Sequence, residues 1–145
     1  MADKAALKTL YTRLVDSRDG YEQAIERLDS ESHKTLFREL HERRTRNAAQ
    51  VRTYLAQQGE QMDDDGSILA AAHRTFLSLK DSVTGAGDEA VLKEVIRGEE
   101  TLLSAYDEAI GDATGADPEY SFVVQQYNEL KAKLDELRGR EQMAA

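Results

Sequence analysis

The sequence contains no cysteine, no tryptophan and a single proline among its 145 residues. The absence of cysteine excludes disulfides, thiolate metal ligands and cysteine nucleophiles, and it fits a reducing compartment. No hydrophobic run is long enough to span a membrane, and the first residues lack the apolar segment of a secretory signal. We therefore expect a cytoplasmic protein without a membrane span.

Positive charge is also scarce, because 28 acidic residues outnumber 19 lysines and arginines and leave a net charge of −9. Nucleic-acid binding depends on clustered lysine and arginine that displace counterions from the phosphates. The one basic run, Arg43, Arg44 and Arg46, is short and is flanked by Glu39 and Glu42. This pattern is typical of a solvated helix face, so nucleic acid is not an expected partner.

The chain is rich in residues that favour helices, and its apolar residues recur with the period of an α-helix. The predicted helices cover about 3–28, 32–58, 67–83, 88–111 and 118–139. The length fits one domain over 1–145, and four long helices with short loops predict an all-α four-helix bundle. The shorter helix can serve as a crossover between the second and third long helices, which would then run parallel. That is the connectivity of a ferritin-like bundle.

Polar residues interrupt the apolar faces of three predicted helices near their midpoints. Glu99 occupies the missing position in the run of Leu92, Val95, Leu102, Tyr106 and Ala109. Arg44 occupies the corresponding gap in the second helix, and the register of the first leaves Ser17 or Arg18 there. A carboxylate on a buried face is costly unless it is paired or binds a metal ion. The central question is which of the two applies to Glu99.

A resemblance to a known family extends over about residues 5–138. The residues that carry it are Asp19-Gly20-Tyr21 with Ala24 and Glu26, Leu36-Phe37 with Glu42-Arg43, Gly66-Ser67, His73-Arg74, Leu79-Lys80, Thr84-Gly85, Arg97-Gly98-Glu99-Glu100 and Ala105-Tyr106. The chain resembles a bacterial family of four-helix-bundle proteins, a domain of unknown function in the ferritin-like superfamily. The resemblance implies a ferritin-like fold. Family members tend to carry a His-Asp pair late in the last helix, where this chain has Leu134-Asp135.

The histidines do not match a ferritin-like di-iron site. Such a site takes a glutamate from each of two helices and a Glu-x-x-His pair from each of the other two. None of His33, His41 and His73 has a glutamate three residues before or after it, and the last helix has no histidine. A standard di-iron centre is therefore not expected. His73, next to the apolar face of the third helix, remains a further candidate side chain.

Two readings of Glu99 follow. In the first, Arg44 and Arg18 neutralise Glu99 in a buried polar layer at the position of the superfamily's metal site, since a guanidinium matches a carboxylate geometrically. In the alternative, Glu22, Glu26, Glu99 and Glu100 form an all-carboxylate site for iron or manganese.

The functional expectation follows the first reading. No Ser/His/Asp arrangement, phosphate-binding glycine loop or nucleotide motif occurs, so no catalytic residues are assigned. We expect a non-catalytic bundle without a cofactor, with a structural or interaction role that includes stress physiology. A homodimer or a protein partner would bind through Tyr11, Tyr54 and Phe122. A metal-binding, oxidase-like protein is the alternative, and a carrier with a small-ligand pocket between helices beside Glu99 and Arg44 is a third.

Overall fold

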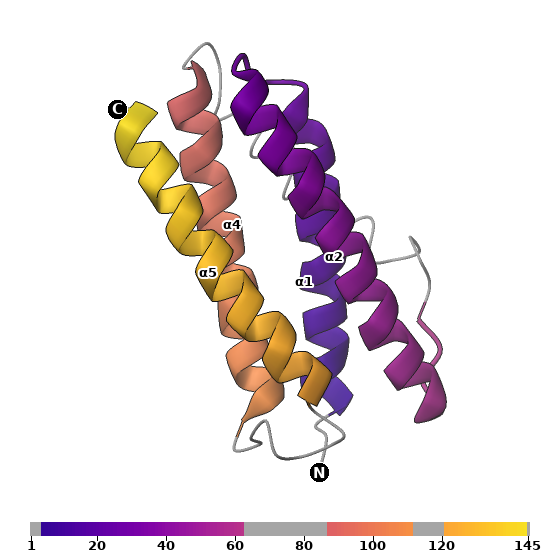
Figure 1. Ribbon diagram of the computed structural model, residues 1–145. Helices are drawn as coiled ribbons and strands as arrows, with labels where there is room; N and C mark the ends of the chain where they lie inside the picture. The colour runs from indigo at the N-terminus through magenta and orange to yellow at the C-terminus, as the bar shows by residue number, and fades with distance from the viewer. Residues whose placement is uncertain (1–3, 63–86, 112–120, 145) are drawn as a thin grey trace.

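The computed structural model describes residues 4–62, 87–111 and 121–144 of the chain, and every regular element in these ranges is a helix (Figure 1). The helices are α1 (Lys4–Ile25), α2 (Glu31–Gln57), α4 (Gly87–Ile110) and α5 (Ser121–Ala144). The prediction of an all-α protein with four long helices is confirmed for these ranges. The shorter helix predicted at 67–83 lies outside them. None of the described helices combines the length and apolarity that a membrane span requires.

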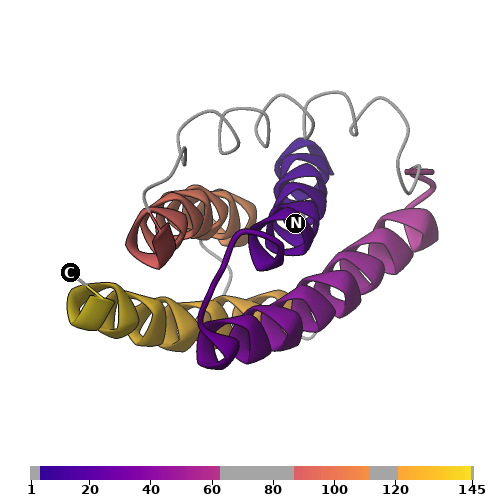
Figure 2. The same cartoon turned by 90° about the horizontal axis from the view of Figure 1, so that it is seen from above.

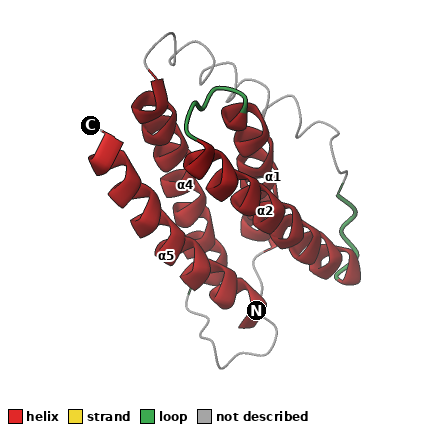
Figure 3. Ribbon diagram, turned by 45° about the horizontal axis from the view of Figure 1, so that its top comes forward, coloured by secondary structure: helices red, strands yellow, loops and turns green. Residues whose placement is uncertain are grey.

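Figure 3 shows where the described helices end and the loops begin. These ends follow local sequence signals, with two differences from expectation. Ser30 caps α2 by accepting a hydrogen bond from the backbone N–H of His33. Gly59, just after α2, has a φ of 85°, which side chains other than glycine rarely adopt. The first difference is that α1 ends at Ile25 rather than near Leu28, although Leu28 still packs in the core.

The second difference is at the C-terminus, where the last helix was predicted to end near residue 139. Helix α5 continues to Ala144. The Arg140 guanidinium donates to Ser32 Oγ at 3.0 Å and lies 3.1 Å from Nδ1 of His33. These contacts with the start of α2 hold the last turns of α5 in place, which is a tertiary effect that the local sequence does not reveal.

Asp88 lies at the beginning of α4 and connects this helix to the α1–α2 loop. Helix α4 begins at Gly87, and the Asp88 carboxylate accepts hydrogen bonds from the backbone N–H groups of Asp29 (2.8 Å) and Ser30 (3.0 Å). It therefore fastens the α1–α2 loop to the beginning of α4.

Figure 2 looks down the bundle formed by α1, α2, α4 and α5. The core between them consists of two hydrophobic clusters, one toward each end of the bundle. One cluster combines the C-terminal parts of α1 and α5 with the N-terminal parts of α2 and α4. The other, called the lower cluster, combines the opposite ends of the same four helices and includes Leu10, Tyr11, Val51, Leu55 and Tyr106. Helices α1 and α5 therefore run in one direction, and α2 and α4 run in the other. The two consecutive described helices α2 and α4 are parallel, unlike neighbours in a simple up-and-down bundle.

Candidate functional site

A buried ion pair lies between the two core clusters. Arg44 projects from α2 and Glu99 from α4, and each side chain is only 2% exposed. Both Nε and Nη2 of Arg44 donate to Oε2 of Glu99, the first at 3.2 Å. Each residue occupies the gap in the apolar face of its own helix, so the helical period that buries its neighbours also buries the charge. The pair thus replaces one layer of the hydrophobic core.

Helix α1 adds a third member to this layer. The Ser17 hydroxyl donates to Oε1 of Glu99 at 2.6 Å, so both carboxylate oxygens of Glu99 accept hydrogen bonds. The neighbouring Arg18, predicted to belong to the layer, does not join it. Its Nε donates to Asp19 at 3.0 Å, and its side chain is 22% exposed. Adjacent helical residues point about 100° apart, so when Ser17 faces α4, Arg18 cannot.

The charges in the layer alter the proton affinities of the groups around it. Burial by itself would lower the pKa of Arg44, but the charge of Glu99 outweighs it and raises the pKa above the ordinary value. Burial, and then the charge of Glu99, raise the pKa of the Tyr21 hydroxyl far above its usual range. Both shifts favour a charged Arg44 and a neutral Tyr21 at neutral pH.

A second polar chain crosses the lower cluster. The Tyr106 hydroxyl of α4 donates to Oε1 of Gln126 in α5 at 2.7 Å, and the Gln126 amide donates to Oε1 of Gln50 in α2 at 2.6 Å. Burial raises the pKa of Tyr106, whose hydroxyl therefore remains a donor. This chain was not predicted from the sequence, because Gln50 and Gln126 break no apolar pattern strongly enough to be noticed.

The four carboxylates of the predicted metal alternative do not come together. Glu22, Glu26 and Glu100 are exposed, whereas Glu99 is buried. Glu100 instead pairs with Arg138 on α5 at 2.9 Å. On α1, the face that includes Ser17 and Tyr21 is turned inward, which leaves positions 22 and 26 on the outside. In the described part of the chain, no three side chains of the types His, Cys, Asp and Glu are arranged to hold a metal ion.

The other candidates from the sequence, for a further site and for an interaction surface, lie in different environments. His73 lies outside the described residues. Tyr11 was predicted for an exposed or dimer-forming surface and is instead 1% exposed within the lower cluster, because the apolar period of α1 carries it inward. Tyr54 and Phe122 are partly buried and pack on each other, with ring centroids 5.7 Å apart.

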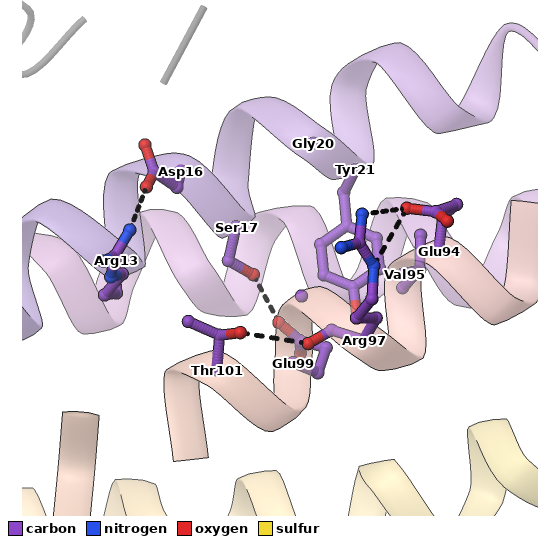
Figure 4. Close-up of a pocket in the computed structure, with 11 residues that line it drawn as sticks. Arg13, Asp16, Ser17, Gly20, Tyr21, Glu94, Val95, Arg97, Glu99 and Thr101 are labelled. Atoms are coloured by element: carbon purple, nitrogen blue, oxygen red, sulfur yellow. Dashed lines mark hydrogen bonds and ion pairs between the residues drawn. The ribbon is translucent and has the colours of Figure 1, made fainter. Parts of the chain in front are cut away.

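A cavity of about 260 Å³ adjoins the layer between α1 and α4 (Figure 4). Ser17 and Glu99 line it, as do Gly20 and Gly98, the two glycines inside these helices. The pair formed by Arg44 and Glu99 is therefore enclosed by protein on the α2 side and adjoins open space on the α1–α4 side. A pocket between helices beside Glu99 and Arg44 was expected only in the third alternative; the cavity is lined by Glu99, and Arg44 is not among its lining residues.

Comparison with known proteins identifies one family. A family described as a domain of unknown function, DUF2383, matches residues 4–112, which include Ser17, Arg44 and Glu99. No curated protein and no solved structure matches the chain. Because the match covers more than half of the sequence, the chain belongs to the DUF2383 family.

Proposed function

We propose that this chain is a non-catalytic member of the ferritin-like superfamily, with a structural or interaction role in the bacterial cytoplasm. The directions of the helices support this relationship. Helices α2 and α4 are parallel, while α1 pairs with α2 and α4 pairs with α5 in antiparallel fashion. A four-helix bundle with one long crossover has this arrangement.

The single observation that carries the proposal is the Arg44–Glu99 ion pair. Both side chains are 2% exposed and lie between the two core clusters, at the level where a di-iron bundle gathers its carboxylates. A guanidinium bonded to the carboxylate uses the oxygen that a metal ion would need. Its positive charge also repels a cation. We infer that Arg44 has taken the place of the metal ion and left a bundle with a structural role.

The test is metal loading of the full-length protein. The purified chain is incubated with Fe(II) or Mn(II) without oxygen, desalted and analysed for metal, and dioxygen uptake is then recorded with Fe(II). The expected results are far less than one metal ion per chain and no uptake above that of free Fe(II). One or two ions per chain, lost in Glu99→Gln and retained in Glu100→Gln, would overturn the proposal in favour of a carboxylate metal site.

The interaction role is tested by the mass of the protein in solution. We propose a homodimer, in which the half-buried pair of Tyr54 and Phe122 lies at the edge of the contact. Analytical ultracentrifugation over a range of concentrations should give twice the chain mass, and Phe122→Ala should shift the equilibrium toward monomer. A monomer at all concentrations would refute the dimer and leave a different protein as the partner.

A further inference from the structure

The side of the bundle between α2 and α5 carries a polar groove. Among the described helices, the closely packed pairs are α1 with α2, α1 with α4, and α4 with α5, so α2 and α5 approach each other less closely. A groove of about 270 Å³ lies between them. Its polar lining comes from one face of each helix, with Arg43, Arg46, Asn47 and Gln50 on α2 and Gln126 and Glu129 on α5. Positions three, four and seven apart share a helix face, so two polar stripes meet here.

Asn47 contributes a buried amide without a partner. The residue is 8% exposed, and its side chain makes no hydrogen bond with any described residue. Its amide atoms are not sealed in the core, because the sealed unpaired side-chain atoms of the described ranges belong to Asp16 and Tyr21. The amide therefore keeps its remaining surface in the groove that Asn47 lines. Polar groups buried this deeply are normally hydrogen-bonded, so an open amide here indicates that a bound molecule completes its bonding.

Gln50 supplies a second free donor, and the buried chain below it sets its orientation. The Tyr106 hydroxyl donates to Oε1 of Gln126, and the Gln126 amide donates to Oε1 of Gln50. Burial raises the pKa of Tyr106 and keeps its proton available for the first of these bonds. Each glutamine therefore accepts on its core side and carries its nitrogen away from the core. The Gln50 nitrogen donates to no described residue and is left to the groove.

Arg46 is the unpaired cation of the lining. It is exposed and forms no ion pair within the described ranges. Arg43, by contrast, is neutralised by Glu39 at 3.3 Å and by Glu129 at 3.6 Å. Helices α2 and α5 are antiparallel, so Glu129 lies at the Arg43 end of the groove and away from Gln50. The other end thus combines one free positive charge with two amide donors, although the whole chain has a net charge of −9.

We propose that this groove binds a small aliphatic carboxylate, whose oxygens accept hydrogen bonds from Arg46 and from the amides of Asn47 and Gln50. A guanidinium matches the geometry of a carboxylate, and hydrogen bonds to a charged acceptor are stronger than those between neutral groups. A water molecule takes about 30 Å³, so 270 Å³ corresponds to about nine water-sized volumes and fits a ligand of about six to ten heavy atoms. The site does not depend on the proposed function.

The test uses succinate as the probe and succinamide as the matched uncharged compound. Heteronuclear NMR of the full-length protein at neutral pH and constant ionic strength follows the side-chain amide signals of Asn47 and Gln50. Both signals should shift and saturate with succinate, and succinamide should bind at least about tenfold more weakly, because it lacks the charge. Inorganic phosphate is the third compound. If phosphate binds as tightly as succinate, the assignment to a carboxylate is wrong and the groove attracts anions in general.

Two variants and a control locate the site. Arg46→Gln should weaken succinate binding about tenfold, since it removes the free charge. Arg38→Gln removes another exposed charge from α2 but does not touch the groove, so binding should be unchanged. Asn47→Leu should abolish the Gln50 shift. It should not lower the stability of the ligand-free protein in urea, because the amide that it replaces has no partner within the protein.

Three results would overturn the proposal. The first is the absence of saturable shifts with succinate, which would leave the groove to water. The second is an Arg46→Gln effect no larger than that of Arg38→Gln. The third is undiminished succinate binding by Asn47→Leu. Metal content and oligomeric state are measured separately, so failure of the proposed function would leave each of these outcomes interpretable.

Discussion

Removing one partner of the Arg44–Glu99 pair should be far more damaging than removing both. In Glu99→Leu, the Arg44 guanidinium stays in a position that is 2% exposed and loses the acceptor of two hydrogen bonds. Breaking a buried ion pair in this way costs about 3–5 kcal/mol of the free energy of unfolding. In Arg44→Met, the Glu99 carboxylate loses its cation and keeps the Ser17 hydroxyl as a donor. We expect a similar loss in the free energy of unfolding.

The double variant Arg44→Met/Glu99→Leu should recover most of that stability. Both charges are then absent, and two apolar side chains of comparable size join the clusters above and below them. Replacements of this kind are often neutral or stabilising. The measurement is urea unfolding at 25 °C, followed by far-UV circular dichroism, for the unaltered protein, both single variants and the double variant. The coupling free energy follows from the cycle of four proteins.

The control is the neighbouring exposed pair. Glu100 and Arg138 are 2.9 Å apart, and their side chains are 52% and 43% exposed. Glu100→Leu should therefore change the free energy of unfolding by about 1 kcal/mol or less. A loss below about 1 kcal/mol in Glu99→Leu would refute the buried pair. A double variant as unstable as the sum of the two single losses would show that the pair does not act as a unit.

Three further predictions concern the groups around the layer. Gly98→Ala and Gly139→Ala should each raise the free energy of unfolding by about 1 kcal/mol, because an added Cβ meets nothing within 4 Å at either site; a loss of stability in Gly98→Ala by urea unfolding would contradict the open cavity. Tyr106→Phe should lose about 1–2 kcal/mol in the same assay, since it leaves the buried Oε1 of Gln126 without its donor; an unchanged unfolding midpoint would contradict this. Burial raises the pKa of the Asp16 carboxyl above its ordinary value of 3.8 in the folded state. Between pH 3.8 and the raised pKa, the folded chain therefore binds more protons than the unfolded chain. The free energy of unfolding falls as pH rises through this interval. Urea unfolding between pH 3 and 8 should show the native protein losing stability relative to Asp16→Asn as pH increases, and a difference that is independent of pH would refute the shift.

The helices themselves could be predicted because their signals are local. The apolar period, the cap at Ser30 and the glycine at position 59 act within one or two turns of the chain. The same period put Arg44 and Glu99 on the apolar faces of their helices. A gap in such a face is visible in the sequence whatever the rest of the fold does.

The sequence could not determine the distances between helices. It also could not determine the rotation of each helix about its own axis to within one residue. The tertiary structure decided that Ser17 rather than Arg18 faces Glu99, and that Glu22 and Glu100 point away from it. A rotation of 100° per residue separates these outcomes, and only packing against the other helices fixes it. The structure also decided that α1 and α4 leave a cavity at Gly98. Its existence depends on how closely two helices approach, which no pattern within either helix records.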